Sequence, residues 1–316
     1  MGQDIERVQA RLSNIHTVEP ILVALRTISL GSWQMALNRR ADLQGYSSRL
    51  LALIPSVLPH LHPERDWNLE ARLRALAPRI PYVRRYYQAP GAALTRQPKS
   101  AVALVIGSER GLCGRFNAIV VEHADKYLTR RQVSGGQIEL AALGSRVART
   151  LEREGHEPAW ARRLPVTTLV PFSMAQELTR QWLRRYEAHD IDAVDIIYNA
   201  YQGAGDYAPI VKRLLPPELP DAARISAGAL WPPIIVETDP LSLYTRLVGQ
   251  WLALSFYYLL LDSAASEHSA RFQLMESATK NTQRLIEELT MEVQSARRQA
   301  ITQEMQELAA GSGLLG

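Results

Sequence analysis

The C-terminal quarter of the chain is the feature that most limits how it can fold. From Leu241 to Gly316 there is no proline, and between Pro240 and Gly311 the only glycine is Gly249. Because both helix breakers are so scarce, this stretch predicts one helix of about 70 residues, roughly 105 Å long at 1.5 Å per residue. A helix of that length needs a second helix to cover its apolar side.

Apolar residues follow this stretch at alternating steps of four and three. A mean step of 3.5 sustained over seven heptads predicts a left-handed coiled coil. The predicted contact positions are Leu247, Trp251, Leu254, Tyr258, Leu261, Ala265, His268, Phe272, Met275, Thr279, Thr282, Ile286, Leu289, Val293, Ala296 and Ala300. His268 is polar, and one polar residue on such a row more often fixes the register than binds a ligand.

The N-terminal residues offer the partner helix. Apolar residues recur there at threes and fours, and less cleanly in the second half of the stretch. They are Ile5, Val8, Leu12, Ile15, Val18, Leu22, Leu25, Ile28, Trp33, Leu37 and Leu50. Pro20 interrupts the pattern at a cost of about 3 kcal/mol, so we expect a kink there or packing that offsets it. Because the two helices lie at opposite chain ends, we expect residues 1–58 and 241–316 to form an antiparallel coiled coil.

Residues 99–240 have a different pattern, in which short apolar runs alternate with amphipathic stretches. This alternation predicts an α/β domain with a Rossmann-like, mostly parallel sheet. The expected strands are Ala101–Ile106, Ile138–Leu143, Val166–Val170, Ala193–Ala200 and Ile234–Glu237. The expected helices are Phe116–Arg131, Ser145–Glu154, Ser173–His189 and Tyr207–Leu215.

A proline-rich segment, residues 59–98, connects the first helix to this domain, with one short helical piece expected near Asn68–Leu76. Within it, "RIPYVRRYYQAP" interleaves arginine with tyrosine, a mixture that can bind single-stranded nucleic acid. The run is short and lies between prolines. We therefore interpret it as a linker or a partner contact and expect no nucleic acid.

The turn "GSERGLCGRFN", Gly107–Asn117, follows the first expected strand, where many α/β proteins bind phosphate or place a nucleophile. It lacks the Lys-Ser or Lys-Thr of a Walker loop, the spacing of a dinucleotide turn and the G-x-S-x-G of a nucleophile elbow. Cys113 could act as a nucleophile only if a histidine met it in space, and no spacing links it to His123 or His156. We interpret the turn, with Gly111, Cys113 and Gly114, as structural.

The composition of the chain excludes several classes of protein. A single cysteine excludes disulfide scaffolds and cysteine-based metal sites and favours a reducing compartment. The pair His60-x-His62 has no carboxylates arranged around it, so we expect no metal, no cofactor and no catalytic residue. With 47% apolar and 22% charged residues the chain is globular, and no uncharged apolar run is long enough to span a bilayer. The charged N-terminus has no apolar core, so no secretory signal or transit peptide is expected.

Four motifs together resemble one family, the γ subunits of F-type ATP synthases. "GSERGLCGRFN" is similar to the family's S-D-R-G-L-C-G-x-x-N turn, and Ile196–Pro216, "IIYNAYQGAGDYAPIVKRLLP", to its segment containing Y-N and L-L-P. Ala265–Gly311 resembles the C-terminal helix almost throughout, and Leu12–Ser29 matches the N-terminal helix more loosely. The resemblance covers the chain end to end and in order.

The resemblance implies a rotor that carries torque and performs no chemistry of its own. Its helical tip would turn inside a ring of α and β subunits, and its globular end would sit with the ε subunit on the membrane ring of c subunits. Catalysis would occur on β. The family's contacts to β carry over to Arg297, Arg298 and Thr302, with Arg271 further along the shaft.

The chain departs from the family pattern at several helix positions. The family usually has other residues at Pro20, Val23, Leu25, Ser32, Val293, Gln294 and Arg298. These departures leave open an alternative type of ATPase, coupled to protons or to sodium. We expect the protein peripherally on the cytoplasmic side of a bacterial plasma membrane. The alternative function is a Rossmann-type enzyme with a coiled-coil oligomerisation arm.

Overall fold

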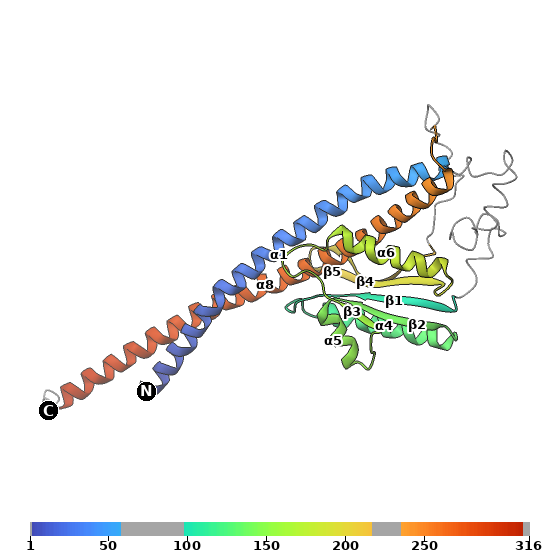
Figure 1. The fold of residues 1–316 in the computed structure, drawn as a ribbon. Helices are drawn as coiled ribbons and strands as arrows, with labels where there is room; N and C mark the ends of the chain where they lie inside the picture. The colour runs from blue at the N-terminus through green and yellow to red at the C-terminus, as the bar shows by residue number, and fades with distance from the viewer. Residues whose placement is uncertain (1, 58–97, 217–234, 312–316) are drawn as a thin grey trace. The chain divides into compact units, whose positions relative to one another are not determined.

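The computed structural model describes residues 2–57, 98–216 and 235–311 (Figure 1). The chain divides into two compact units. The terminal unit comprises Met1–Gly31 and Arg271–Gly316, and the central unit comprises Ser32–Ala270. Two long helices, α1 (Gly2–Val57) and α8 (Pro240–Gly311), each contribute to both units.

The two helices run antiparallel in the central unit and are in contact in the terminal unit. In the terminal unit the Gln283 amide nitrogen lies 3.5 Å from a Glu19 carboxylate oxygen. In the central unit Arg39 of α1 lies 3.4 Å from the Tyr257 hydroxyl of α8, while Leu50, further along α1, lines one groove with Leu247. Advancing along α1 therefore means moving back along α8, as the sequence predicts.

From Phe272 to Ala300 every predicted contact position of α8 is buried or half-buried while most residues between them are exposed, so the predicted row is confirmed there. From Leu247 to Ala270 no residue is exposed, and burial does not single out one row. On α1 the prediction is partly wrong, because Val18 and Ile28 are exposed. Strict alternation of threes and fours continues from Ile15 through Glu19, which is half-buried, to Ser29, which is buried. The inward-facing positions of α1 therefore keep the 3.5-residue period, but some of them are occupied by polar residues.

Pro20 does not end the first helix, since α1 is continuous across it. The proline ring lies on the exposed side of the helix. On that side water can satisfy the His16 carbonyl, which has lost its partner four residues on.

The central unit contains a five-stranded sheet in the order β3-β2-β1-β4-β5. Its strands are β1 (Ser100–Ile106), β2 (Gln137–Leu143), β3 (Trp160–Arg162), β4 (Ala193–Gly203) and β5 (Asp206–Leu215). The first four are mutually parallel and β5 is antiparallel to β4. The predicted α/β class with a mostly parallel sheet and terminal helices is thus confirmed.

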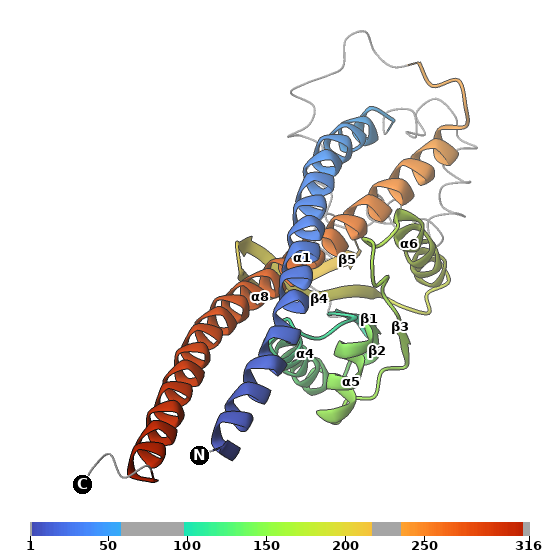
Figure 2. The same cartoon turned by 90° about the vertical axis from the view of Figure 1, so that its left-hand side faces the viewer.

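Helices cover both faces of this sheet (Figures 1 and 2). The helices α4 (Phe116–Val133) and α5 (Ser145–Arg153) pack on one face, against side chains such as Ala103 and Val105 of β1. The other face is covered by α6 (Phe172–Glu187) together with the parts of α1 and α8 in the central unit.

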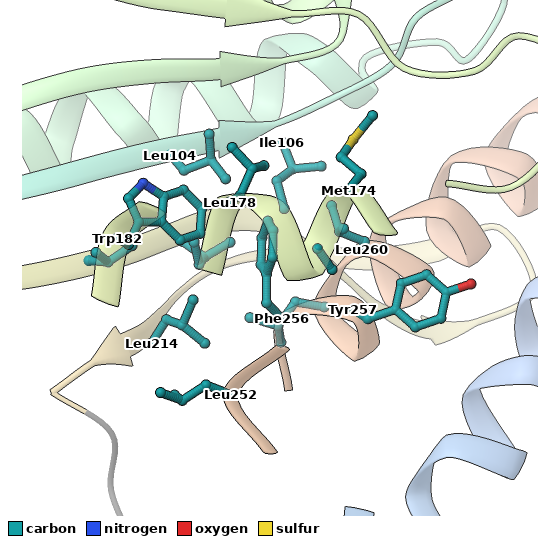
Figure 3. Close-up of a cluster of buried hydrophobic side chains, with 14 of the residues drawn as sticks. Leu104, Ile106, Met174, Leu178, Trp182, Leu214, Leu252, Phe256, Tyr257 and Leu260 are labelled. Atoms are coloured by element: carbon teal, nitrogen blue, oxygen red, sulfur yellow. The ribbon is translucent and has the colours of Figure 1, made fainter. Parts of the chain in front are cut away.

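The core on that second face is rich in aromatic residues (Figure 3). Phe256 of α8 meets Trp182 of α6 edge-to-face with ring centroids 5.1 Å apart, and Tyr257 meets Phe172 at 5.4 Å. Such pairs add about 0.5–1.5 kcal/mol to the effect of burial alone. In this unit α8 therefore packs into the core of the sheet domain, which consists of β1–β5 with α4, α5 and α6, and it also forms one half of a helix pair.

Three expected elements are wrong. The helix at Tyr207–Leu215 is strand β5, because the two residues Ala204 and Gly205 close a tight hairpin with β4 and Gly205 has φ +76°. Val166–Val170 is not a strand. Its buried members pack into the core without pairing, and the short edge strand β3 precedes them. Residues 235–237 form no strand either, and Ile234 lies outside the described residues.

The expected helix at Asn68–Leu76 and the "RIPYVRRYYQAP" run lie outside the described residues, as do His60 and His62. Most of the proline-rich segment 59–98 is likewise not described. The division into a coiled-coil shaft, this segment and a domain at 99–240 stays a prediction.

Candidate functional site

The glycine-rich turn after β1 is held by its own side chains. The Asn117 side chain accepts a hydrogen bond from the Ser108 amide at 2.9 Å and donates one to the Ser108 hydroxyl at 2.7 Å. Gly107 sits so close to α5 that a Cβ there would lie 2.4 Å from the Cβ of Val147. The first glycine of the motif is therefore required by helix packing.

Glu109 lies in the same turn and binds two other segments, the start of α5 and residues 163–164. Its carboxylate accepts hydrogen bonds from the Ser145 amide at 2.9 Å, the Ser145 hydroxyl at 2.7 Å and the Leu164 amide at 3.0 Å, and it pairs with Arg163 at 3.0 Å. Burial by itself would raise the pKa of Glu109, but these hydrogen bonds outweigh it and lower the pKa to about 2. An ionised Glu109 at the first turn of α5 also complements the helix dipole.

Cys113 is buried beneath this turn. Its sulfur lies 3.5 Å from the Ser108 hydroxyl and 3.9 Å from the Arg110 carbonyl oxygen. The Asn117 side-chain nitrogen also lies 3.8 Å from the sulfur. The structural interpretation of Cys113 stays a prediction, and these contacts support it.

Gly111 and Gly114 shape the exposed side of the turn. Gly114 has φ +60°, a left-handed conformation that glycine adopts without strain. A Cβ at Gly111 would meet only the Arg146 side chain, at 3.9 Å. The conformational need for glycine is thus stronger at Gly114 than at Gly111.

A longer-range contact fixes where the turn ends. The buried Asn199 side chain of β4 donates to the Phe116 carbonyl oxygen at 2.8 Å, at the start of α4. The sequence patterns gave no prediction for Asn199, Glu109 or Ser108. The only available signal was that Asn199 stands in the Y-N pair of a motif already singled out.

The predicted partner contacts near the end of α8 do not all share one surface. Arg297, Arg298 and Thr302 are exposed, and the Thr302 hydroxyl donates to the Arg298 carbonyl oxygen at 2.8 Å, one turn earlier. Arg271 belongs to the same compact unit but is buried. The structure therefore places three of the four residues on open helix surface and the fourth inside.

The last described turns of α8 carry an exposed apolar row that the sequence analysis missed. Ile301, Met305 and Leu308 follow each other at steps of four and three, and their exposed fraction rises from 57% to 73%. Every residue from 301 to 308 is exposed. Large apolar side chains this open, on one side of a helix, are typical of a surface that a partner covers.

The described residues include a cavity of about 320 Å³ in which His156 lies 2.9 Å from Asp125. Within these ranges no group of three or more histidine, cysteine or carboxylate side chains could hold a metal ion. A groove of about 530 Å³ lies between α6 and the start of α8, and its lining includes Gln176, Thr179 and Arg180 but no histidine, cysteine or carboxylate. None of the helices described has the length and apolarity that crossing a membrane requires.

Comparison with known sequences gives one consistent result. The sequence model of a family described as ATP synthase matches residues 4–315. The ATP synthase gamma chain of Moorella thermoacetica is 31% identical over 322 residues, which cover 99% of this chain and 98% of that one. The gamma chain of Sorangium cellulosum is 26% identical over 327 residues, covering 98% of each.

Solved structures share the fold at low sequence identity. A chain of the Euglena gracilis mitochondrial ATP synthase, from a structure of its OSCP, F1 and c-ring, superposes with a TM-score of 0.60 at 14% identity, covering 100% of this chain and 95% of that one. A chain from the central stalk and c-ring of the Tetrahymena thermophila enzyme gives 0.53 at 18% identity, with coverages of 82% and 99%.

Proposed function

This chain belongs to the ATP synthase family, related over nearly its whole length to gamma chains, and we propose from this premise how its surfaces take part in rotary catalysis. It is a rotor subunit of the central stalk of an F-type ATP synthase. It therefore works as part of a membrane-associated complex.

We propose that the chain itself performs no chemistry. The α and β subunits would form the catalytic head around the terminal unit, and the sheet domain would contact ε and the ring of c subunits. The mutually hydrogen-bonded turn at Gly107–Asn117 supports this division, since its side chains hold α4 and α5 in place. The complex would lie on the cytoplasmic side of a bacterial plasma membrane.

The observation that carries the coupling role is the open surface at the end of α8. Arg297, Arg298 and Thr302 lie just before and within the exposed apolar row of Ile301 and Met305. Arginine can form bidentate, charge-assisted hydrogen bonds with carboxylates of a partner. The few polar anchors would engage β loops, and the apolar row would slide within the head.

Co-expression with the α and β partners of the same organism tests this function. We expect the chain to co-purify with both and to raise the ATPase activity of the assembled head. An enzyme with a coiled-coil oligomerisation arm would not co-purify with them.

The isolated chain provides the complementary measurement. We expect no ATPase activity and no ATP binding in calorimetry, because the turn has neither the Lys-Ser nor the glycine spacing of a nucleotide site. Tight binding of ATP to the pure monomer would contradict a purely mechanical role.

A further inference from the structure

Two clusters in the central unit, each built around a buried aspartate, have the same three side chains but join different parts of it. The helix–sheet triad consists of Arg40, Asp262 and Tyr198, which come from α1, α8 and β4. The sheet triad consists of Arg213, Asp195 and Tyr127. In each, an arginine and a tyrosine bind one buried aspartate.

The helix–sheet triad is a three-way junction. Arg40 pairs with Asp262 through Nη1, and the Tyr198 hydroxyl is hydrogen-bonded to the same carboxylate. Burial and the Asp262 charge raise the pKa of Tyr198, so the phenol remains a proton donor. The Asp262 side chain is 8% exposed and that of Arg40 25%.

Two further rings hold the guanidinium of Arg40. It lies over Tyr201 of β4 at 5.4 Å and over Tyr258 of α8 at 5.8 Å from the ring centroids. A planar guanidinium between aromatic faces, with a carboxylate at its edge, has one preferred position and orientation. A lysine could not reproduce that arrangement.

The other contacts between the helices and the sheet are mostly apolar. Ala36 and Ile54 of α1 and residues of α8 such as Phe256 share one core with the strands. Apolar contacts are non-directional and tolerate shifts of packing, whereas buried polar groups are best known for fixing register. A buried ion pair adds little net stability over an apolar pair of the same volume, so stability alone does not account for it.

We infer that the helix–sheet triad fixes the rotational register of α1 and α8 on the sheet domain, so that torque applied to one is transmitted to the other without slip. This inference rests on the proposed function. Arg40, Asp262 and Tyr198 are then positioning residues for coupling, remote from any reacting group.

The sheet triad supplies a matched control. Arg213 binds Asp195 through two hydrogen bonds of 2.8 Å each, and the Tyr127 hydroxyl also donates to Asp195. The Asp195 side chain is 2% exposed. All three residues lie on β4, β5 and α4, so this triad holds the sheet domain together but joins it to neither long helix.

The test replaces each ion pair by an apolar pair of similar volume in the assembled, membrane-reconstituted complex. The variants are Arg40→Met with Asp262→Leu, and Arg213→Met with Asp195→Leu. The readouts are ATP hydrolysis, ATP-driven ion pumping, and thermal stability of the isolated chain. Arg40→Met and Arg213→Met each leave a buried aspartate without its cation, so we expect these two single substitutions to lower stability and both doubles to restore it.

In the helix–sheet double variant we expect hydrolysis at or above the wild-type rate, but the number of ions pumped per ATP lowered roughly threefold or more, because a pair of contacting residues that fixes the register has been removed. The sheet double variant is expected to pump as wild type. Wild-type pumping by the helix–sheet double variant overturns the inference, as does an equal loss in both doubles, which would indicate a general loosening. A wild-type complex that hydrolyses ATP without pumping contradicts the proposed function instead.

Discussion

The two halves of α8 are parts of one helix in very different surroundings. From Leu247 to Ala270, in the central unit, no residue is exposed. From Leu274 to Leu308, in the terminal unit, most residues are exposed and buried ones recur only along the contact row. The first half is enclosed by the sheet domain, whereas the second meets one partner helix within its unit.

The two halves of α8 are therefore suited to different tasks, force transmission in the first and contact with partners in the second. A helix buried on all sides cannot change its neighbours without disrupting a core, so it is suited to transmit force into the sheet domain. A helix with one narrow apolar row leaves the rest of its surface for partners that change as it turns. Substitutions of apolar residues in the first half should therefore affect mainly stability, and substitutions of exposed residues in the second half mainly coupling.

The largest expected effect is that of Phe256→Ala. Phe256 is fully buried and stacks edge-to-face on Trp182, so its removal leaves a cavity in the shared core. We expect a loss of about 3–5 kcal/mol in the free energy of unfolding of the isolated chain. Chemical denaturation followed by circular dichroism measures it. Leu289→Ala, on the contact row of the terminal unit, is the matched change and should cost less, and an equal loss would erase the distinction between the two halves.

Next in size is the effect of Glu109→Gln in the central unit. Because the folded pKa of Glu109 is about 2, below its ordinary value of 4.5, its ionised form stabilises the fold. That contribution, on the order of 3 kcal/mol, is complete above about pH 5 and is lost as the pH falls through the folded pKa. We expect Glu109→Gln to lower stability at pH 7 and to flatten the decline between pH 5 and 2.

The control for Glu109 is Glu122→Gln, since Glu122 is exposed and paired only with the exposed Arg115. It should leave both the stability at pH 7 and the acid decline almost unchanged. If the two variants show the same acid profile, the anchoring of α5 and residue 164 by Glu109 contributes nothing measurable.

The sequence predicts the elements whose pattern is local and strict. The α8 contact row follows a heptad without breakers, and β1 and β4 are long apolar runs, so all three were found close to their observed bounds. The predicted contact positions of α1 are wrong from Val18 onward, because the inward positions there include Glu19 and Ser29. A search for apolar residues cannot find contact positions that are polar. Strand β5 was missed because its apolar spacing suited a helix and the Ala204–Gly205 turn was not recognised.

Of the candidate site, the sequence could predict only that the turn at Gly107–Asn117 lacks a catalytic motif and that it resembles a family motif. Failed phosphate motifs indicated a structural turn, but which side chains hold it depends on contacts across the fold. Glu109 reaches Ser145, 36 residues away, and Asn199 reaches Phe116, 83 residues away. The burial of Arg271 could not be anticipated either, since arginine is rarely buried and its position on the helix gave no sign of it.

The third expected effect lies in the terminal unit and concerns coupling. We predict that Arg297→Ala with Thr302→Ala lowers ATP hydrolysis by the assembled complex roughly tenfold, the loss of one or two charge-assisted contacts, without dissociating it. Both side chains are exposed, so the isolated chain should unfold as wild type does. Steady-state hydrolysis and gel filtration of the purified complex measure the two effects.

Removal of residues 311–316 is the comparison for this double variant. This stretch carries no charged side chain, so we expect its loss to reduce hydrolysis much less. If the truncation is the more damaging change, the anchors are misplaced and the apolar end of α8 is the coupling element.

The smallest expected effect is that of Cys113→Ser, which separates burial from function within the central unit. Cys113 is as buried as the core residues around it, so burial alone would rank it with Phe256. The substitution, however, keeps the shape of the side chain and exchanges a weak donor for a stronger one. A serine hydroxyl can reach the same partners, the Ser108 hydroxyl and the Arg110 carbonyl oxygen, with little movement of the turn. We expect the free energy of unfolding to change by less than about 1 kcal/mol and ATP hydrolysis by the complex to stay near wild type.

Hydrolysis is the decisive measurement, because a thiol that served as a nucleophile could not be replaced by an unactivated hydroxyl. A hundredfold loss of turnover in a normally assembled complex would make the turn at Gly107–Asn117 a catalytic site, contrary to the mechanical role proposed for the chain.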